Sequence, residues 1–311
     1  MSKSMKKLVL LAIAQSAKGT PGTPVAGTNA ILCKGFVPTP IKGKFVQRNL
    51  IEGAKGNYGA IHSGEFRTFD FEVELAGSGT AGTAPGFGPL LIGCNMSETV
   101  SAAVSVAYQP IAGDAAYLTF YGYLDGLLFK LTDARGTVSF TLNSEEIPVM
   151  KFSYTGAYSA ITDTAFPTGM SFTAFTKPLT VGQVNTPTFT LDSIALVVKS
   201  FSMDLANQVS WRNWIGDSGA KAPDRTPKAS SVFELTSVAT KNWGETVRLG
   251  TEMPLNLVHG ITAGNIVTLT APKLQIDADP TITDDAGTAL LSCSFAVIPN
   301  AGNDELVLTF T

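Results

Sequence analysis

The sequence predicts an all-β protein that contains two similar modules. Residues 69–75 alternate strictly between four apolar side chains and three acids, which is the period of a half-buried strand. Two short segments also recur in the same order. Arg-Asn-Leu-Ile at 48–51 returns as Arg-Asn-Trp-Ile at 212–215, and Thr-Asp-Ala-Arg-Gly-Thr at 132–137 returns as Thr-Asp-Asp-Ala-Gly-Thr at 283–288. The offsets are similar, 212 − 48 = 164 and 283 − 132 = 151, which favours one β-rich module used twice.

In the first half, turn signals follow one another at short intervals. Asp125-Gly126 is the strongest short hairpin signal and separates predicted strands at 116–124 and 127–132. Residues 133–136 predict a second turn, into a strand at 137–142. The alternating segment 149–155 follows. Four strands with short turns predict an antiparallel meander.

The second half has the same character, with little helical periodicity. Strands are predicted at 194–205, 208–215, 231–238, 265–270, 273–277, 288–298 and 305–310. Short helices are predicted at 89–96 and 252–259.

Proline-containing stretches divide the chain into four predicted parts. These are an extended N-terminal arm (1–30), a first β module (31–176), a linker (177–190) and a second β module (191–311). A long irregular loop is predicted after each Arg-Asn-x-Ile segment, at 52–64 and at 216–230. Loops longer than about 12 residues are usually functional or disordered, so this pair is expected to reach another subunit.

Charge is scarce and unevenly distributed. Charged residues make up 15% of the chain, against about 25% in a typical soluble domain, which suggests that much of the exterior meets other protein. Residues 1–51 carry eight Lys or Arg and no acid, whereas residues 274–311 carry six acids and no base. Either the two ends of the subunit attract each other across a repeated contact, or they form two ordinary solvated faces.

The N-terminus resembles the beginning of a signal peptide, because Lys6 and Lys7 precede an apolar stretch at 8–14. Cleavage after Ala14 would leave only residues 8–11 as the apolar core, and a signal peptide needs roughly seven to fifteen. The segment is therefore predicted to be an arm or strand that packs on a neighbour. No stretch approaches the roughly 20 apolar residues of a membrane span.

The sequence predicts no catalytic, cofactor or metal site. Residues 77–82 match Gly-x-Gly-x-x-Gly, but Pro85 and Pro89 prevent the long helix that a dinucleotide site needs. The two histidines, His62 and His259, are predicted to be surface or capping residues. The three cysteines are widely spaced, which favours buried apolar roles over a disulfide or zinc site.

Six segments, taken in order, resemble the major tail protein (tail tube protein) of long non-contractile-tailed bacteriophages, the siphophages. They are residues 15–24, 74–85, 89–91, 108–110, 123–126 and 134–137. The resemblance covers most of residues 8–170. It is weaker over 190–311, where only the general style of the strands and the loop after Arg212-Asn213 match.

The resemblance implies tail-tube-type β-barrel or sandwich modules, with short helices and long inter-ring loops, that form rings and have no catalytic site. The rings would stack into a hollow tube around a tape-measure protein, between tail terminator and distal tail proteins, and DNA would pass through without tight binding. Assembly would occur in the host bacterial cytoplasm. With two modules per chain, we expect trimeric, pseudo-sixfold rings. A secreted or surface β-sandwich adhesin is the alternative, and a hydrolase on a β scaffold is disfavoured because no nucleophile–His pair is apparent.

Two sets of residues are predicted to act in such a tube. Acids expected to line the lumen are Asp277, Asp279, Asp284, Asp285, Glu72 and Glu74. Residues expected to contact the neighbouring ring are Lys55, Asn57, Tyr58, His62, Asp217, Lys221, Asp224 and Arg225. The acids from 277 onward have a second possible use, which is pairing with the basic residues 1–51 of the next subunit.

Overall fold

Strands dominate the regular secondary structure, as predicted. The structure, a computed structural model, describes residues 3–48, 50, 56, 58–113 and 116–311. Within them, one branched sheet joins 19 strands and a separate hairpin joins two more. The described helices are short: α1 (Ala26–Asn29), α2 (Gly88–Gly93) and α3 (Trp243–Leu249). The all-β prediction is confirmed.

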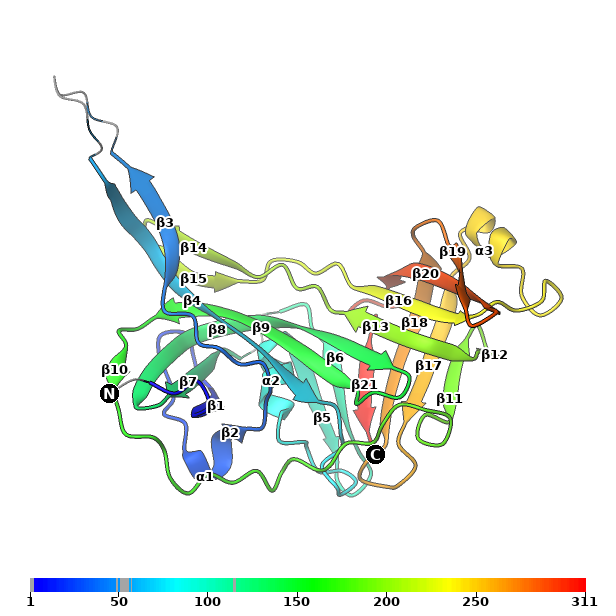
Figure 1. Cartoon of the computed structure of the whole chain (residues 1–311), viewed down its shortest axis with the longest axis horizontal. Coiled ribbons are helices and arrows are strands. Elements are labelled where there is room, and N and C mark those ends of the chain that lie inside the picture. Colours follow the sequence, from blue (N-terminus) through cyan, green and yellow to red (C-terminus); the bar gives the residue numbers. More distant parts are fainter. Residues whose placement is uncertain (1–2, 49, 51–55, 57, 114–115) are drawn as a thin grey trace.

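The strands of the two halves follow one another along the chain (Figure 1). The first half holds β1 (Leu8–Ala14), β2 (Ala30–Ile31), β3 (Lys42–Gln47), β4 (Ala60–Glu74), β5 (Met96–Ser101), β6 (Ser105–Pro110), β7 (Leu118–Leu124), β8 (Leu127–Asn143), β9 (Val149–Tyr158) and β10 (Thr162–Asp163). The second half holds β11 (Thr188–Leu191), β12 (Ile194–Ala195), β13 (Val198–Asp204), β14 (Ser210–Trp214), β15 (Asp217–Lys221), β16 (Lys228–Glu234), β17 (Met253–His259), β18 (Val267–Ile276), β19 (Thr281–Asp285), β20 (Thr288–Ile298) and β21 (Val307–Phe310).

The same five antiparallel strand pairings occur in each half. In the first half they are β1·β7, β7·β8, β8·β9, β4·β9 and β3·β4. In the second half they are β11·β17, β17·β18, β18·β20, β16·β20 and β13·β16. A short helix also follows an equivalent strand in each half: α2 follows β4, and α3 follows β16. This recurrence is what a duplicated module would produce, whereas the predicted boundaries of the modules remain a prediction.

The two halves are fused edge to edge. Residues 139–143 of β8 pair antiparallel with residues 200–204 of β13, for example Thr141 with Ser202. The result is a continuous run of eight strands in the order β3-β4-β9-β8-β13-β16-β20-β19. Antiparallel sheets commonly keep one face solvated, and this run has one buried and one open face.

The buried face carries a single core that draws residues from both halves. Phe71, Phe120 and Tyr154 pack ring against ring in the first half, and Phe233 packs against Trp243 in the second. Burying one such side chain contributes about 1.5–3 kcal/mol.

The backbone of β8 lies so close to this core at Gly136 that a side chain would not fit, because a Cβ there would lie 2.6 Å from the ring of Tyr154.

Several local predictions are confirmed. The Asp125-Gly126 turn joins β7 to β8, with φ angles of 39° and 86°, which suit a type I′ turn. Helix α2 (Gly88–Gly93) overlaps the helix predicted at 89–96 but ends three residues earlier.

Other local predictions are wrong. Residues 133–136 form no turn; β8 runs through them with a bulge, because Asp133 takes a left-handed φ of 49°. Residues 253–259 of the helix predicted at 252–259 form strand β17 instead, since Met253, Leu255 and Leu257 alternate into the core. The strands predicted at 265–270 and 273–277 are one strand, β18. The segment 8–14 is no free arm, because it pairs as β1 with β7 of its own chain.

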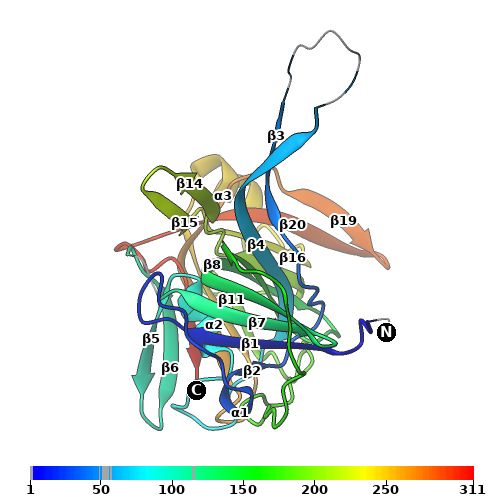
Figure 2. The same cartoon turned by 90° about the vertical axis from the view of Figure 1, so that its left-hand side faces the viewer.

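A long hairpin stands out from the body of the protein. Strand β3 and the first residues of β4 extend well beyond the rest of the sheet (Figures 1 and 2). Beside its base lies the β14–β15 hairpin. The two hairpins occupy equivalent places in the chain. The projecting hairpin is formed by β3 and β4 themselves. The β14–β15 hairpin lies in the connection between their counterparts, β13 and β16.

Candidate assembly surfaces

The open face of the eight-strand run carries small polar side chains. Strand pairing aligns Glu72, Lys151, Ser139, Asp204 and Lys228 in one row across β4, β9, β8, β13 and β16. The neighbouring rows are mainly serine and threonine: Thr137, Thr141, Ser153, Thr155, Ser200, Ser202, Ser230, Ser292 and Ser294. Such side chains make the face hydrophilic with little charge and little bulk.

Acids outnumber bases on the open face. Among the paired residues of β4, β9, β13 and β16, this face carries five acids, Asp70, Glu72, Glu74, Asp204 and Glu234, and two bases, Lys151 and Lys228, so 2 − 5 = −3 for these four strands. On the two edge strands the same side also carries Lys42, opposite Phe66, and Asp285, opposite Thr288. Two of the predicted lumen acids, Glu72 and Glu74, are therefore on this face. Sequence reasoning missed Asp70, Asp204 and Glu234; the strict alternation of 69–75 put Asp70 on the same face as Glu72, so that signal was available.

The other four predicted lumen acids lie at one end of the run. Asp277 and Asp279 are exposed between β18 and β19, and Asp284 and Asp285 are exposed at the end of β19. A carboxylate oxygen of Asp285 is 2.7 Å from Nζ of Lys199. The structure thus separates the six acids into two groups, and whether either faces a channel remains a prediction.

The first predicted contact loop belongs to the projecting hairpin. Lys55 and Asn57 lie outside the described residues, and Tyr58 is half-buried near the tip. His62 is not in a loop but in β4, where its ring packs edge-on against Phe45 with centroids 4.9 Å apart. Its Nδ1 is 3.7 Å from a carboxylate oxygen of Glu65.

Strand β4 of the projecting hairpin packs against the β14–β15 hairpin. Phe66 of β4 stacks on Trp211 of β14, with ring centroids 5.9 Å apart and planes 16° apart. A Cβ on Gly64 would lie 3.5 Å from the side-chain amide of Asn213. The paired hairpins therefore support each other on one side of the protein.

The second predicted contact loop is shorter than expected. Residues 217–221 form β15, and β16 begins at Lys228, so only 222–227 are irregular. Asp217 accepts a hydrogen bond from Nζ of Lys18 (2.5 Å) and lies 3.1 Å from Nζ of Lys221. Hydrogen bonds from these two lysines lower the pKa of Asp217.

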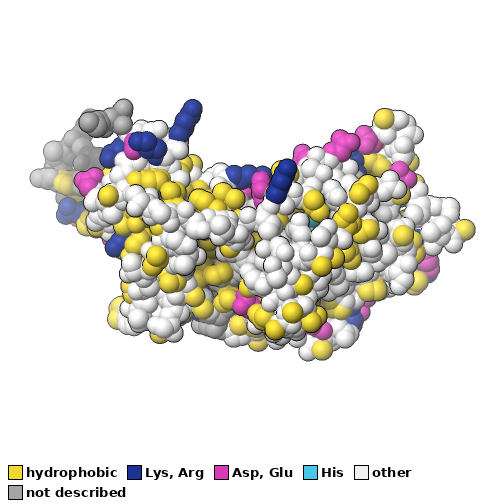
Figure 3. Space-filling view, turned by 90° about the horizontal axis from the view of Figure 1, so that it is seen from below, with side chains coloured by type: hydrophobic (Ala, Val, Ile, Leu, Met, Phe, Trp, Pro, Cys, Tyr) yellow, Lys and Arg dark blue, Asp and Glu magenta, His cyan; other side chains and the backbone are white. Residues whose placement is uncertain are grey.

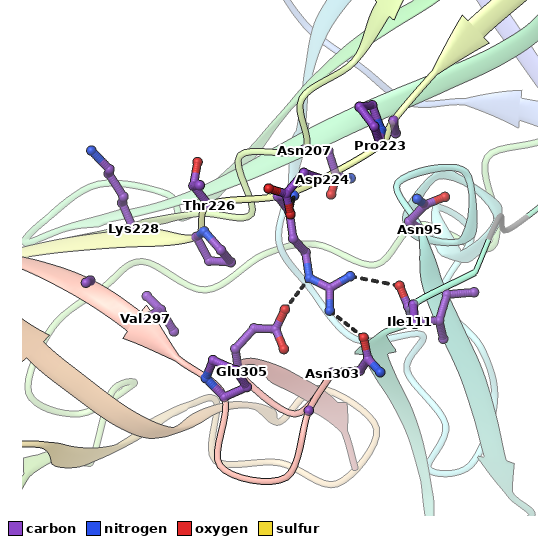
Figure 4. A pocket seen from close by; sticks show the side chains of 17 residues that line it. Asn95, Ile111, Asn207, Pro223, Asp224, Thr226, Lys228, Val297, Asn303 and Glu305 are labelled. Carbon is purple, nitrogen blue, oxygen red and sulfur yellow. Dashed lines mark hydrogen bonds and ion pairs between the residues drawn. The ribbon is translucent and has the colours of Figure 1, made fainter.

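Arg225 serves its own chain and does not project. It lies in a cavity of about 610 Å³ between the two halves, which Asp224 also lines (Figure 4). Its guanidinium pairs with the buried Glu305 and donates to the carbonyl of Ile111 (2.8 Å) and to Asn303 Oδ1 (2.7 Å). These contacts join the connection between β15 and β16 to the segment before β7, through Ile111, and to the segment before β21, through Asn303 and Glu305.

Cys94, Cys293 and His259 are buried. Burial raises the pKa of Cys94 and of Cys293 to about 12. His259 is buried, not on the surface, and its Nδ1 lies 2.9 Å from Oγ1 of Thr186. Within the described ranges, no group of three or more His, Cys, Asp or Glu is placed to hold a metal ion. Likewise, none of the described helices is long and apolar enough to cross a membrane.

Comparison with known protein families identifies a match that spans most of the chain. Residues 9–297 match the family described as phage tail tube protein, and this span covers both halves and their joint. No curated protein matches the chain significantly. Because the match extends over nearly the whole sequence, the chain belongs to the phage tail tube protein family.

Proposed function

We propose that the chain self-assembles into rings that stack into the hollow tail tube of a long non-contractile-tailed phage. Membership of the family makes it a structural component of the virion tail, and a structural role implies no enzymatic one. The observation that carries the proposal is the eight-strand run, which is open at both ends, buried on one face and polar on the other. A subunit with two free edges and one hydrophilic face is suited to closing a ring around water.

The ring is proposed to contain three chains. Residues 31–176 and 191–311, joined by 177–190, would each supply one repeat, so three chains supply six repeats. The five recurring strand pairings support this count. Electron microscopy of the purified protein tests it: threefold rings with pseudo-sixfold features are expected. Rings of six chains would contradict the argument from duplication, and monomers under all conditions would contradict the proposed function.

The open face is proposed to line the channel through which DNA leaves. Duplex DNA carries about one negative charge per 1.7 Å of its axis, so a basic wall would retain the genome. A face on which acids outnumber bases and most other side chains are short hydroxyls would let the DNA slide. The acids Glu74 and Glu234, which end the equivalent strands β4 and β16, make a suitable test pair.

The test replaces Glu74 and Glu234 with Lys. Tubes should still assemble, and ejection of DNA from reconstituted virions should become slower and more sensitive to salt. Asp163→Lys, on the exposed strand β10, is the matched control and should leave ejection unchanged. Ejection at the normal rate from the doubly substituted tubes would contradict the proposal that the open face lines the channel.

The projecting hairpins are proposed to contact the next ring, and the tube to surround a tape-measure protein between terminator and distal tail proteins. The length of the β3–β4 hairpin and its packing against β14 support this role. Assembly in the host bacterial cytoplasm agrees with the buried, reduced state of Cys94 and Cys293.

A further inference from the structure

A pocket of about 830 Å³ lies beside strands β11 and β12, where the end of β8 meets the second half. Apolar side chains form much of its lining: Leu142, Val181, Phe189, Leu196, Val197, Val198, Phe201 and Leu257. We propose that this pocket receives Trp214 and Ile215, the tip of the β14–β15 hairpin, from a subunit of the neighbouring ring. This inference rests on the proposed stacking of rings and names the place where one of the two hairpins docks.

The recurring strand pairings locate the same position in the first half. Leu10 pairs with Ile31 across β1 and β2, and Thr190 pairs with Ala195 across β11 and β12. A pocket lined by β1 and by the residues on and after β2 occurs there as well, but its volume is only about 200 Å³. The two halves therefore share the pocket and differ in how far their own side chains fill it.

Smaller side chains explain the greater volume in the second half. Thr190 occupies the place of Leu10. Ala195 occupies the place of Ile31. The segment after β10 also adds Phe172 to the lining of the smaller pocket. The second pocket keeps an apolar wall with space that its own chain does not fill, and pockets of roughly 300–1,000 Å³ are the size that takes up a guest.

The β14–β15 hairpin ends in apolar side chains that its own chain does not cover. Trp214 pairs with Asp217, which places Ile215 in the turn. Trp214 is 67% exposed and Ile215 is fully exposed. The base of the hairpin is supported, because Trp211 stacks on a ring of β4. Tryptophan is enriched among the residues that dominate binding energy at protein interfaces, so a supported hairpin with this tip is suited to anchor a contact.

The tip and the pocket lie at opposite ends of the strand run. Strand β13 begins at Val198, in the pocket lining, and ends at Asp204, after which the chain continues into β14. Strand β8 runs antiparallel to β13, so Leu142 near its end is also at the pocket. Figure 1 shows this separation, with β14 and β15 at the upper left and β11 and β12 at the lower right. Copies stacked in one orientation can therefore repeat the contact head to tail.

Charges beside the tip and beside the pocket are complementary. The guanidinium carbon of Arg212 lies 4.0 Å from the centre of the Trp214 ring, which puts a positive charge next to the tip. Glu145 and Glu146 are exposed in the turn after β8. The N–H of Glu145 donates to the carbonyl of Val181 (2.9 Å), a lining residue, so the turn is held at the pocket. Arg212 approaches these carboxylates when Trp214 enters, and such complementarity fixes the register of a contact.

Removing the tip and filling the pocket should have the same effect. Trp214→Ala with Ile215→Ser removes the guest, and Thr190→Leu with Ala195→Ile installs the side chains found at the equivalent positions of the first half. Each variant should form rings as the wild type does, and the protein concentration needed for tubes should rise at least about tenfold. Val25→Ser, at an exposed apolar residue before α1, is the matched control and should leave tube formation unchanged.

Normal tubes from both folded variants would overturn the docking of the tip while the proposed function stands. A wild type that forms no rings or tubes under any condition would instead contradict the proposed function, and the contact with it. Circular dichroism and urea unfolding of each variant separate these outcomes from a failure to fold.

A cross-link identifies which copies are in contact. Ile215→Cys puts a thiol on the tip, and Val197→Cys puts one in the pocket, where this residue is 63% exposed. Mild oxidation of tubes should join chains that carry both substitutions, and chains with either one alone are the controls for the three native cysteines. Equal cross-linking in isolated rings would place the contact within a ring and refute the stacking role. Tubes without the cross-link would show that the tip docks elsewhere.

Charge reversal with rescue tests the orientation of the docked tip. Arg212→Glu should weaken tube formation, because it brings like charges together at the rim of the pocket. Adding Glu145→Arg and Glu146→Arg to the same chain should restore it. If the chain with all three changes assembles no better than Arg212→Glu alone, the proposed orientation is wrong.

Discussion

Arg67 is expected to be a main determinant of the stability of the first half, and Arg67→Met should destabilise the subunit by about 2–4 kcal/mol. The side chain is fully buried. Its guanidinium donates to the carbonyl of Pro40 from Nε (3.1 Å) and Nη2 (2.8 Å), and to the carbonyls of Lys130 and Ser159. The ring of Tyr158 lies 4.9 Å from the guanidinium carbon.

The magnitude follows from the groups that methionine would leave unpaired. Each buried carbonyl without a donor costs about 1–3 kcal/mol. Pro40 is exposed, so water can replace the lost bonds there, which leaves the carbonyls of Lys130 and Ser159. Two such groups give about 2–6 kcal/mol. Removing a buried charge offsets part of this, since desolvation also lowers the pKa of Arg67.

Urea unfolding of the unassembled subunit measures this effect as a lower midpoint at an unchanged slope. Arg67→Lys should be intermediate, because an ammonium cannot reproduce the planar fork of donors. Arg248→Met is the control; Arg248 is exposed and pairs with Glu245 in the same helix turn, so its loss should be much smaller than that of Arg67. The reasoning fails if Arg67→Met is as mild as the control.

Three further outcomes are expected. Burial lowers the pKa of His259 in the folded protein. The stability that the neutral imidazole supports is therefore complete above its unfolded pKa of about 6.5 and is lost as pH falls through the lower folded value. In urea titrations at different pH, His259→Gln should reduce this loss of stability in acid. Cys94 and Cys293, with pKa values raised to about 12, should resist iodoacetamide at pH 8 until the protein is unfolded, and rapid labelling of the native protein would contradict their burial. Deleting residues 54–62 should leave a folded subunit that forms rings but no tubes, and normal tubes would reject the inter-ring role of this hairpin.

Strand existence could be predicted from the sequence because alternation and turn residues act locally. Residues 69–75 and the Asp125-Gly126 turn show this directly. Strand β17 was mistaken for a helix because its alternation, Met253, Leu255, Leu257, is short and follows Gly250 and Thr251 closely. Helix α3 was missed although Asn242 caps it by accepting from the N–H of Glu245 (3.1 Å) and Gly250 ends it with φ 62°.

The recurring sequence segments were a better guide to a repeated module than to the local structure of the segments themselves. The Arg-Asn-x-Ile pair lies in equivalent connections, between β3 and β4 and between β13 and β16. The second pair does not correspond: residues 132–137 form a bulge inside β8, while residues 283–288 form the β19–β20 turn. Local sequence sets a turn only when the strands beside it stop pairing, and β8 keeps pairing with β9 on both sides of its bulge.

The use of the acidic residues could not be read from the sequence because strand register decides it. A step of one residue along a strand moves a side chain to the other face. Asp285 pairs with Thr288 on the side of the open polar face, whereas Asp284 pairs with Ala289 on the opposite side. Neighbouring acids on β19 therefore lie on opposite faces of the sheet, and only Asp285 is beside the proposed channel. Composition locates the acidic charge near one end of the chain, and the pairing of β19 with β20 assigns its side chains to the two faces of the sheet.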